Sequence, residues 1–198
     1  MKKLLKIVKE TDNKYLNLYH AIYQYENGKV KEYEFASRRN QERLVLNNNE
    51  RRADAVRILP YYKKGDNIFV VFIKEFRSPL NRYIYSLPAG MVDEGESSES
   101  AAIRETYEEI GGNVLKLEKV VECAYSSAGL TDENITSFNA EIELSGTQHL
   151  EESEDIKLKI VKLDDVLDFI NNNEFCLPSA LQSQAFYYKH INDKQKVK

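Results

Sequence analysis

Residues 87–112, LPAGMVDEGESSESAAIRETYEEIGG, constrain the fold more than any other stretch of the chain. A serine pair at 97–98 can cap a helix that runs to residue 110, and Glu99 favours the positive end of the helix dipole. A glycine pair at 111–112 can supply the C-terminal turn. The sequence therefore predicts a central helix with both ends fixed, preceded by a turn that contains Gly90.

Three carboxylates crowd one edge of this predicted helix. Glu105 and Glu109 are four residues apart, and Glu108 is three residues from Glu105, so all three side chains are neighbours. Like charges at this spacing destabilise a helix by about 0.2–0.5 kcal/mol per pair, whereas a divalent cation would reverse the sign. Arg104 could restrain one carboxylate through a bidentate contact. A solvated acidic face is the alternative interpretation.

The spacing of the whole stretch weakens that alternative. Seven positions form a pattern that average residue usage would produce in roughly one chain per million of this length. They are Gly90, Glu96, Arg104, Glu105, Glu108, Glu109 and Gly111.

The composition is that of a folded protein with one core. The chain has 198 residues, of which 42% are hydrophobic and 30% charged, and its 13 Tyr and 8 Phe argue against disorder. The formal net charge of −4 provides no basic surface for nucleic acid. Any attraction for a phosphate compound must therefore come from local arginines or a metal.

Nothing in the sequence indicates secretion or membrane insertion. The two cysteines do not suggest a disulfide-rich domain, and charges interrupt the apolar residues of the first ten positions. The longest apolar run, at 68–73, is too short to span a bilayer. We expect a soluble, cytoplasmic protein with no nucleic-acid or membrane partner.

The remaining patterns predict a mixed α/β fold. Asn-Gly at 27–28, between two strand-like runs, is a strong hairpin signal. Strands are expected at 53–62 and 67–77, further strands within 114–144, and a last strand at 156–163. Two helices should follow, the second with Pro178 in its first turn. Helices covering a sheet are the expected architecture.

The stretch from Gly90 to Gly112 resembles the Nudix box, a signature of hydrolases that act on nucleoside diphosphates linked to another moiety. All seven fixed positions match, while Thr106 and Gly112 stand where the family prefers aliphatic residues. The resemblance implies a Nudix-type α/β/α sandwich with a mixed sheet and an N-terminal antiparallel β-hairpin. Residues 1–45 would be the hairpin region, with a role in dimerisation, and residues 46–198 the Nudix hydrolase domain.

The resemblance also implies a site for Mg²⁺, with Mn²⁺ as the alternative ion. Glu105 and Glu109 would be ligands, Glu108 a further or bridging ligand, and the backbone carbonyl of Ala89 would complete the set. Gly90, which lacks a Cβ, would let the chain turn tightly beside the metal.

Several stretches outside the box resemble the ADP-ribose pyrophosphatase branch of the family. They are EFASRRN at 34–40, KEFRSPLNRYIYSLPAG at 74–90, AGLTDE at 128–133 and HLEESEDIKL at 149–158. By position, Arg38 and Arg77 would bind substrate, with Met91 and Glu133 as further pocket candidates. Surface ion pairs are the alternative for Arg38, core packing for Met91, and turn capping for Glu133.

The acidic segment EESED at 151–155 would be a solvated turn if read by itself. In the resembled branch this loop supplies the catalytic base, which by position is Glu152, or Glu151 if the register differs by one. Glu154 would be an additional metal ligand. Glu108 and Arg104 would complete the catalytic group.

The most specific function that follows is metal-dependent hydrolysis of a nucleoside diphosphate sugar, first ADP-ribose to AMP and ribose 5-phosphate, by a homodimer. Ser126 and Ala128 replace two prolines that the branch commonly carries, and Ser86 replaces a glutamate, which leaves another nucleotide sugar or a dinucleotide open. A Nudix domain that binds nucleotide sugars without hydrolysing them is the alternative outside the enzymes.

Overall fold

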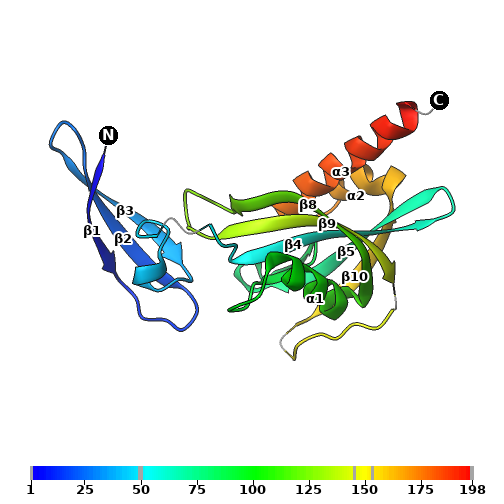
Figure 1. The fold of residues 1–198 in the computed structure, drawn as a ribbon, viewed down its shortest axis with the longest axis horizontal. Coiled ribbons are helices and arrows are strands. Elements are labelled where there is room, and N and C mark those ends of the chain that lie inside the picture. The colour runs from blue at the N-terminus through cyan, green and yellow to red at the C-terminus, as the bar shows by residue number, and fades with distance from the viewer. Residues whose placement is uncertain (1, 49–50, 145, 153, 197–198) are drawn as a thin grey trace. The chain divides into compact units, whose positions relative to one another are not determined.

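The computed structural model describes residues 2–48, 51–144, 146–152 and 154–196 (Figure 1). The chain forms two compact units, each described separately below. One contains residues 1–54 and 123–135, and the other contains residues 55–122 and 136–198. Among the described residues, no helix is long and apolar enough to cross a membrane.

The N-terminal unit is a three-stranded antiparallel sheet of β1 (Lys3–Lys9), β2 (Asn17–Gln24) and β3 (Val30–Ser37), in that order. The predicted hairpin is confirmed as β2 and β3, and Gly28 takes the positive φ of 78° that their turn requires. Strand β1, which the sequence analysis did not predict, pairs with the free edge of β2.

A small core and a half-buried ion pair stabilise this unit. Tyr19 lies opposite Phe35 across the β2–β3 ladder, and their rings stack with centroids 5.6 Å apart. The short 3-10 helix Gln41–Arg43 follows β3. Arg39 then donates from Nε and Nη2 to the two carboxylate oxygens of Asp54, at 3.0 and 2.9 Å.

Residues 123–135, from the middle of the sequence, return to this unit. The amide of Ala36 donates to the Leu130 carbonyl at 2.8 Å, and the Tyr33 hydroxyl donates to the Gly129 carbonyl at 2.7 Å. The amide of Asn134 donates to the Asp54 carboxylate at 2.9 Å. The unit therefore depends on a segment that follows the central helix in sequence.

The second unit is built on a mixed sheet in the order β10-β5-β4-β9-β8, with β6 paired to β5 and β7 to β4. The predicted strands at 53–62 and 67–77 are confirmed as β4 and β5. The strands are β4 (Ala55–Lys64), β5 (Asn67–Arg77), β6 (Arg82–Ser86), β7 (Ala89–Met91), β8 (Gly112–Tyr125), β9 (Asn134–Leu144) and β10 (Ile156–Lys162).

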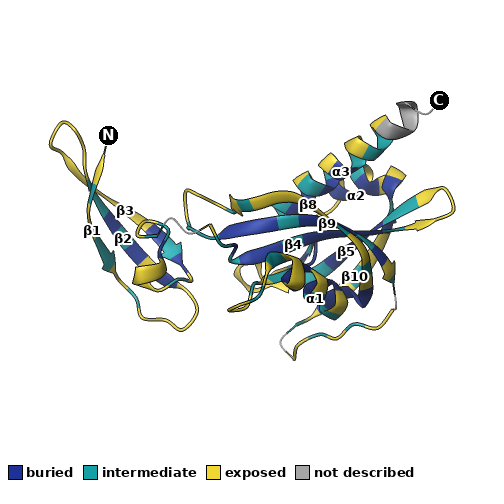
Figure 2. Ribbon diagram, in the orientation of Figure 1, coloured by how far each residue is buried: buried dark blue, intermediate teal, exposed yellow. Residues whose placement is uncertain are grey.

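Helices cover both faces of this sheet, as predicted. On one face α1 (Ser98–Ile110) packs Ala101, Ala102 and Ile110 against the alternating side chains of β4 and β5. On the other face α2 (Val166–Asn171) and α3 (Leu177–Lys196) cover the side chains between them, including Val70 and Phe72. Figure 2 shows the buried central strands between the helices. Alternation along the strands thus creates the two cores.

Candidate active site

Helix α1 is fixed at both ends as the sequence predicts. The Ser97 hydroxyl accepts a hydrogen bond from the amide of Ser100 at 3.1 Å. Gly111 ends the helix in the left-handed region, with φ 64°, and its amide donates to the Tyr107 carbonyl at 3.0 Å. The helix is fixed at both ends, and its apolar face packs against the sheet. Its rotation about its own axis is therefore fixed, and this determines where its carboxylates lie.

The two departures from the Nudix box fit the local packing. The buried Thr106 hydroxyl donates to the Ala102 carbonyl at 2.6 Å, so no polar atom is left unpaired there. At buried Gly112, an added Cβ would lie 3.1 Å from a methyl of Ile142 and 3.3 Å from one of Ile110. The neighbouring isoleucines already fill the space of the expected aliphatic side chain.

Arg104 joins the carboxylates of the box to the turn that precedes α1. Its Nε and Nη2 donate to the two oxygens of Glu96, at 3.2 and 3.0 Å. Its Nη1 lies 2.7 Å from Glu105 Oε1 and 3.0 Å from Glu108 Oε2. These hydrogen bonds, that with Glu96 first, raise the pKa of the Arg104 guanidinium, so it stays charged. The planar guanidinium, with its five donors, can bond these three carboxylates at once.

Gly90 lies directly against the Glu105 carboxylate. An added Cβ at this position would lie 1.8 Å from Glu105 Oε1 and 2.0 Å from its carboxyl carbon. Glu105 is only 7% exposed, and burial raises its pKa against the opposing effect of Arg104. A side chain at position 90 would therefore displace the Glu105 carboxylate. Gly90 lies within β7, opposite Val56 on β4, and its φ is not positive, so the turn that the sequence analysis expected at this glycine is not found.

Glu109 is the most deeply buried carboxylate of the cluster, at 4% exposure. Its Oε2 accepts a hydrogen bond from the amide of Ala89 at 3.2 Å. Burial first, and then the negative charges of Glu105, Glu154 and Glu75, raise the pKa of Glu109 well above its ordinary value. A buried carboxylate in such surroundings must either take up a proton or be neutralised by a cation.

The sequence analysis missed Glu75, which lies two residues before Arg77 on β5. Burial raises the pKa of Glu75, with the Arg77 guanidinium opposing and Glu154 adding to the shift. Arg77 Nη2 lies 2.8 Å from Glu75 Oε2. Because residues i and i+2 of a strand share a face, the Glu-Phe-Arg spacing was the signal that could have paired them.

The acidic loop comes close to this cluster through Glu154, whose charge acts on Glu75, Glu105 and Glu109. The loop forms a local turn in which the amide of Glu154 donates to the Glu151 carbonyl at 3.0 Å. In return, the amide of Glu151 donates to Glu154 Oε2 at 2.9 Å. Glu152 is exposed at this turn.

The other predicted site residues lie in different places. Met91, on β7, is 43% exposed, and its carbonyl accepts a hydrogen bond from Arg104 at 2.9 Å. Arg38 and Glu133 both belong to the N-terminal unit, where Arg38 Nε is 3.6 Å from Glu133 Oε1. The Ser126 hydroxyl donates to the other oxygen of Glu133 at 2.8 Å.

The chemistry of the carboxylate cluster suits a hard divalent cation, which prefers oxygen ligands. Glu105 and Glu109 are buried, lie beside Glu154 and Glu75, and carry raised pKa values because burial opposes their charged forms. Within the described part of the chain, no three His, Cys, Asp or Glu side chains already stand as a metal cage. Arg104 instead holds Glu105 and Glu108, so cation binding would require these carboxylates to turn.

Comparison with known proteins agrees with this geometry. The profile of the NUDIX domain matches residues 51–177. A Nudix hydrolase of Schizosaccharomyces pombe is 31% identical over 88% of this chain and 85% of its own length. An ADP-ribose pyrophosphatase of Bacillus subtilis is 34% identical over 70% of this chain and 73% of its own.

The fold also matches a solved structure, described as the crystal structure of an ADP compounds hydrolase. The TM-score is 0.73 at 16% identity, over 98% of this chain and 95% of the other. That identity supports the fold alone. The profile match over residues 51–177 and the relative from Schizosaccharomyces pombe, with the seven matched positions of the box, show that the chain belongs to the Nudix family of hydrolases.

Proposed function

We propose that the chain hydrolyses the pyrophosphate bond of a nucleoside diphosphate sugar, ADP-ribose first, with Mg²⁺ as its cofactor and Mn²⁺ as the alternative. The observation that carries this proposal is the pair of buried carboxylates, Glu105, which lies against Gly90, and Glu109, which is close to Glu154 of the acidic loop. The relative from Bacillus subtilis and one from Saccharomyces cerevisiae, 28% identical over 90% of this chain, are both ADP-ribose pyrophosphatases.

Residues of α1 and the acidic loop would hold the metal. Glu105, Glu108 and Glu109 are the proposed ligands, with Glu154 and the carbonyl of Ala89 as further ones. When bound, the cation offsets the negative charge of the pyrophosphate oxygens. Arg104 now holds Glu105 and Glu108 in place. On metal binding, the cation would replace Arg104 in part of these contacts.

The reaction itself requires a base and a bound diphosphate. Water adds to one phosphorus of the P–O–P bridge, and the bond from that phosphorus to the bridging oxygen breaks. The bridging oxygen leaves with the other phosphate. Glu152 accepts the proton of the attacking water, with Glu151 as the alternative base. With ADP-ribose the products are AMP and ribose 5-phosphate.

The proposed substrate contacts are Arg77, Met91, Arg38 and Glu133. Arg77, now paired with Glu75, is the proposed phosphate contact in the second unit, with Met91 beside the box. Arg38 and Glu133 are the proposed contacts from the N-terminal unit. We further propose a cytoplasmic homodimer to which residues 1–45 contribute, with residues 46–198 as the hydrolase domain. Sedimentation of only monomer at micromolar concentration would contradict the dimer.

One observation favours another nucleotide sugar as the second candidate. Ser126, in place of a proline of the resembled branch, donates through its hydroxyl to Glu133, which in turn lies beside Arg38. Proline could make neither this hydrogen bond nor the one from the Ser126 amide to the Glu133 carbonyl, at 3.0 Å. A differently held Glu133 would alter the part of the substrate that it contacts.

The test is phosphate-coupled turnover with Mg²⁺ or Mn²⁺ on ADP-ribose, ADP-glucose, GDP-mannose, NADH and diadenosine polyphosphates. We expect metal-dependent turnover with ADP-ribose as the best substrate, and loss of most turnover in Glu109→Gln. Glu118→Gln is the matched control, because Glu118 pairs with Lys189 on the surface of the same unit. Preference for another member of the panel selects the second candidate, and silence with both metals contradicts the proposal.

A further inference from the structure

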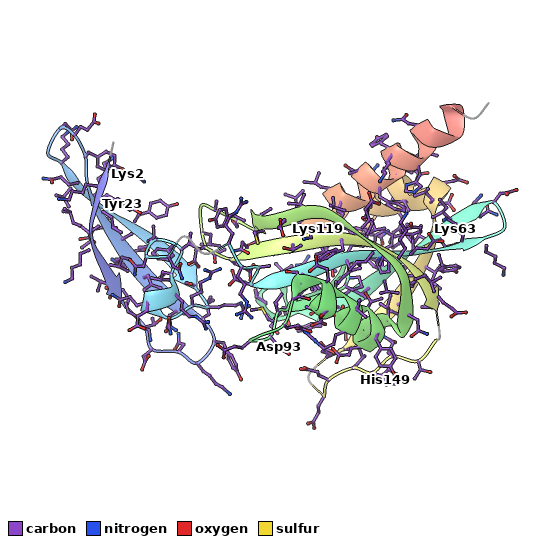
Figure 3. The ribbon with its side chains drawn as sticks, in the orientation of Figure 1. Lys2, Tyr23, Lys63, Asp93, Lys119 and His149 are labelled. Atoms are coloured by element: carbon purple, nitrogen blue, oxygen red, sulfur yellow. The ribbon has the colours of Figure 1, made fainter. Side chains whose placement is uncertain are left out.

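The acidic loop is attached to the C-terminal end of α1 by several contacts. The amide of His149 donates to the Glu108 carbonyl at 2.8 Å, and the His149 ring stacks on Tyr107 with centroids 4.4 Å apart. Figure 3 shows His149 beside this helix. An added Cβ at Gly111 would lie 2.1 Å from the Thr147 carbonyl oxygen. The chain therefore enters the loop in direct contact with the helix that carries the carboxylates.

One side chain joins this point of entry to the point where the loop ends. Gln148 Nε2 donates to the Glu109 carbonyl at 2.7 Å and lies 3.4 Å from the Ile156 carbonyl. Ile156 is the first residue of β10, and it lies opposite Glu75 on β5. The side-chain amide of Gln148 thus connects the C-terminal end of α1 and the start of the loop to the first residue of β10.

The acidic residues of the loop lie in the segment between the two ends that Gln148 joins. Glu151, Glu152 and Glu154 all lie between Gln148 and Ile156, and Glu154 interacts electrostatically with Glu105 and Glu109 on α1. The His149 amide anchors the start of the loop on α1 and the β10–β5 pairing anchors its end, and the Gln148 side chain joins these two anchors to each other. Loss of the connection would let the carboxylates move relative to the helix.

We infer that Gln148 is a positioning residue for hydrolysis, whose side-chain amide closes the base of the acidic loop and fixes the loop carboxylates beside α1. This inference rests on the proposed function, because it assigns the base to that loop. Gln148 acts through the main chain and need not contact the substrate. Displacement of a catalytic group by about 1 Å is enough to lower turnover by about 100-fold.

The test uses two Gln148 variants that cannot form both hydrogen bonds. Gln148→Met removes the amide, and Gln148→Asn keeps an amide that is one methylene too short. Gln182→Met is the matched control, because Gln182 Nε2 also donates to a main-chain carbonyl of the same unit, that of Phe138, at 2.9 Å. Hydrogen exchange of metal-free protein and steady-state kinetics with Mg²⁺ are measured on all three.

Both Gln148 variants should raise hydrogen exchange in peptides covering residues 149–155 by about five- to tenfold, the factor for one lost hydrogen bond. They should lower kcat by about 10- to 100-fold with KM within about twofold, since an interaction needed only in the transition state is lost. Gln182→Met should change neither quantity. A general loss of stability would instead affect Gln182→Met as well.

Unchanged exchange in the loop, or a kcat within about twofold of the parent despite faster exchange, would overturn the inference. Failure of the proposed function gives a different result. In that case the parent protein itself shows no metal-dependent turnover on the nucleotide panel, while the exchange comparison still reports whether Gln148 holds the loop.

Discussion

Replacing Glu109 with glutamine should stabilise the metal-free protein and remove most of its stabilisation by Mg²⁺. Glutamine has nearly the same shape, and its carbonyl can still accept the hydrogen bond from the amide of Ala89. It carries no charge, so both the burial cost and the repulsion from Glu105, Glu154 and Glu75 disappear. Relief of a buried, incompletely satisfied group is worth about 1–2 kcal/mol, or about 2–8 °C in Tm for a chain of this size.

Mg²⁺, in contrast, should stabilise the parent more than the variant. At a Mg²⁺ concentration of about 100 times Kd, the parent gains about 2.7 kcal/mol, or about 5–10 °C in Tm. The variant lacks one charged ligand and should gain less than about a third of this. Differential scanning calorimetry in EDTA and across a Mg²⁺ titration measures both arms, with Glu118→Gln as the control.

A variant less stable than the parent in EDTA would show that the Glu109 carboxylate is stabilised in the metal-free protein, against the reasoning from its burial. A full Mg²⁺ shift in the variant would show that the metal binds elsewhere. Only the combination of a higher Tm in EDTA and a lost Mg²⁺ response agrees with a buried, metal-binding carboxylate.

Three further outcomes are expected. Burial raises the pKa values of Glu105 and Glu109 above the ordinary glutamate value of about 4.5. The metal-free parent should therefore lose stability as the pH rises from about 4.5 through the raised values. Thermal scans should show a weaker dependence of Tm on pH in Glu109→Gln. Gly90→Ala should displace Glu105 and lower kcat about 100-fold, while urea titration shows a stability loss of about 1–3 kcal/mol; an unchanged kcat would refute the close approach. Ser126→Ala should raise KM for the preferred nucleotide about fivefold, with kcat within about twofold, by releasing Glu133; an unchanged KM would separate Ser126 from substrate binding.

The helix and its carboxylates could be predicted because they depend on local spacing. The serine before the helix, the glycine after it and the four-residue separation of Glu105 and Glu109 fix the helix and its acidic edge within one stretch of chain. The hairpin at Asn27 and Gly28 followed for the same reason. Roles carried over by resemblance, such as that of Glu152 as the base, remain predictions.

Contacts between distant segments could not be predicted in the same way. Glu75 joins the carboxylate cluster only because β5 pairs with β10, which follows the acidic loop. The Arg39–Asp54 pair likewise acquires its third partner, Asn134, from a segment 80 residues after Asp54. The pattern of residues within one segment does not indicate a partner in another segment. Glutamate, arginine, aspartate and asparagine are also common on any protein surface, so their presence alone gives no signal.

The division of the chain into two units limits how the N-terminal unit could be gained or lost. The chain passes between the units at 54/55, 122/123 and 135/136, so no single cut separates them. Deleting residues 1–54 would leave the carbonyl of Leu130 and the amide of Asn134 without their partners, Ala36 and Asp54. An exchange of this unit that keeps its internal hydrogen bonds must therefore replace residues 123–135 together with residues 1–54.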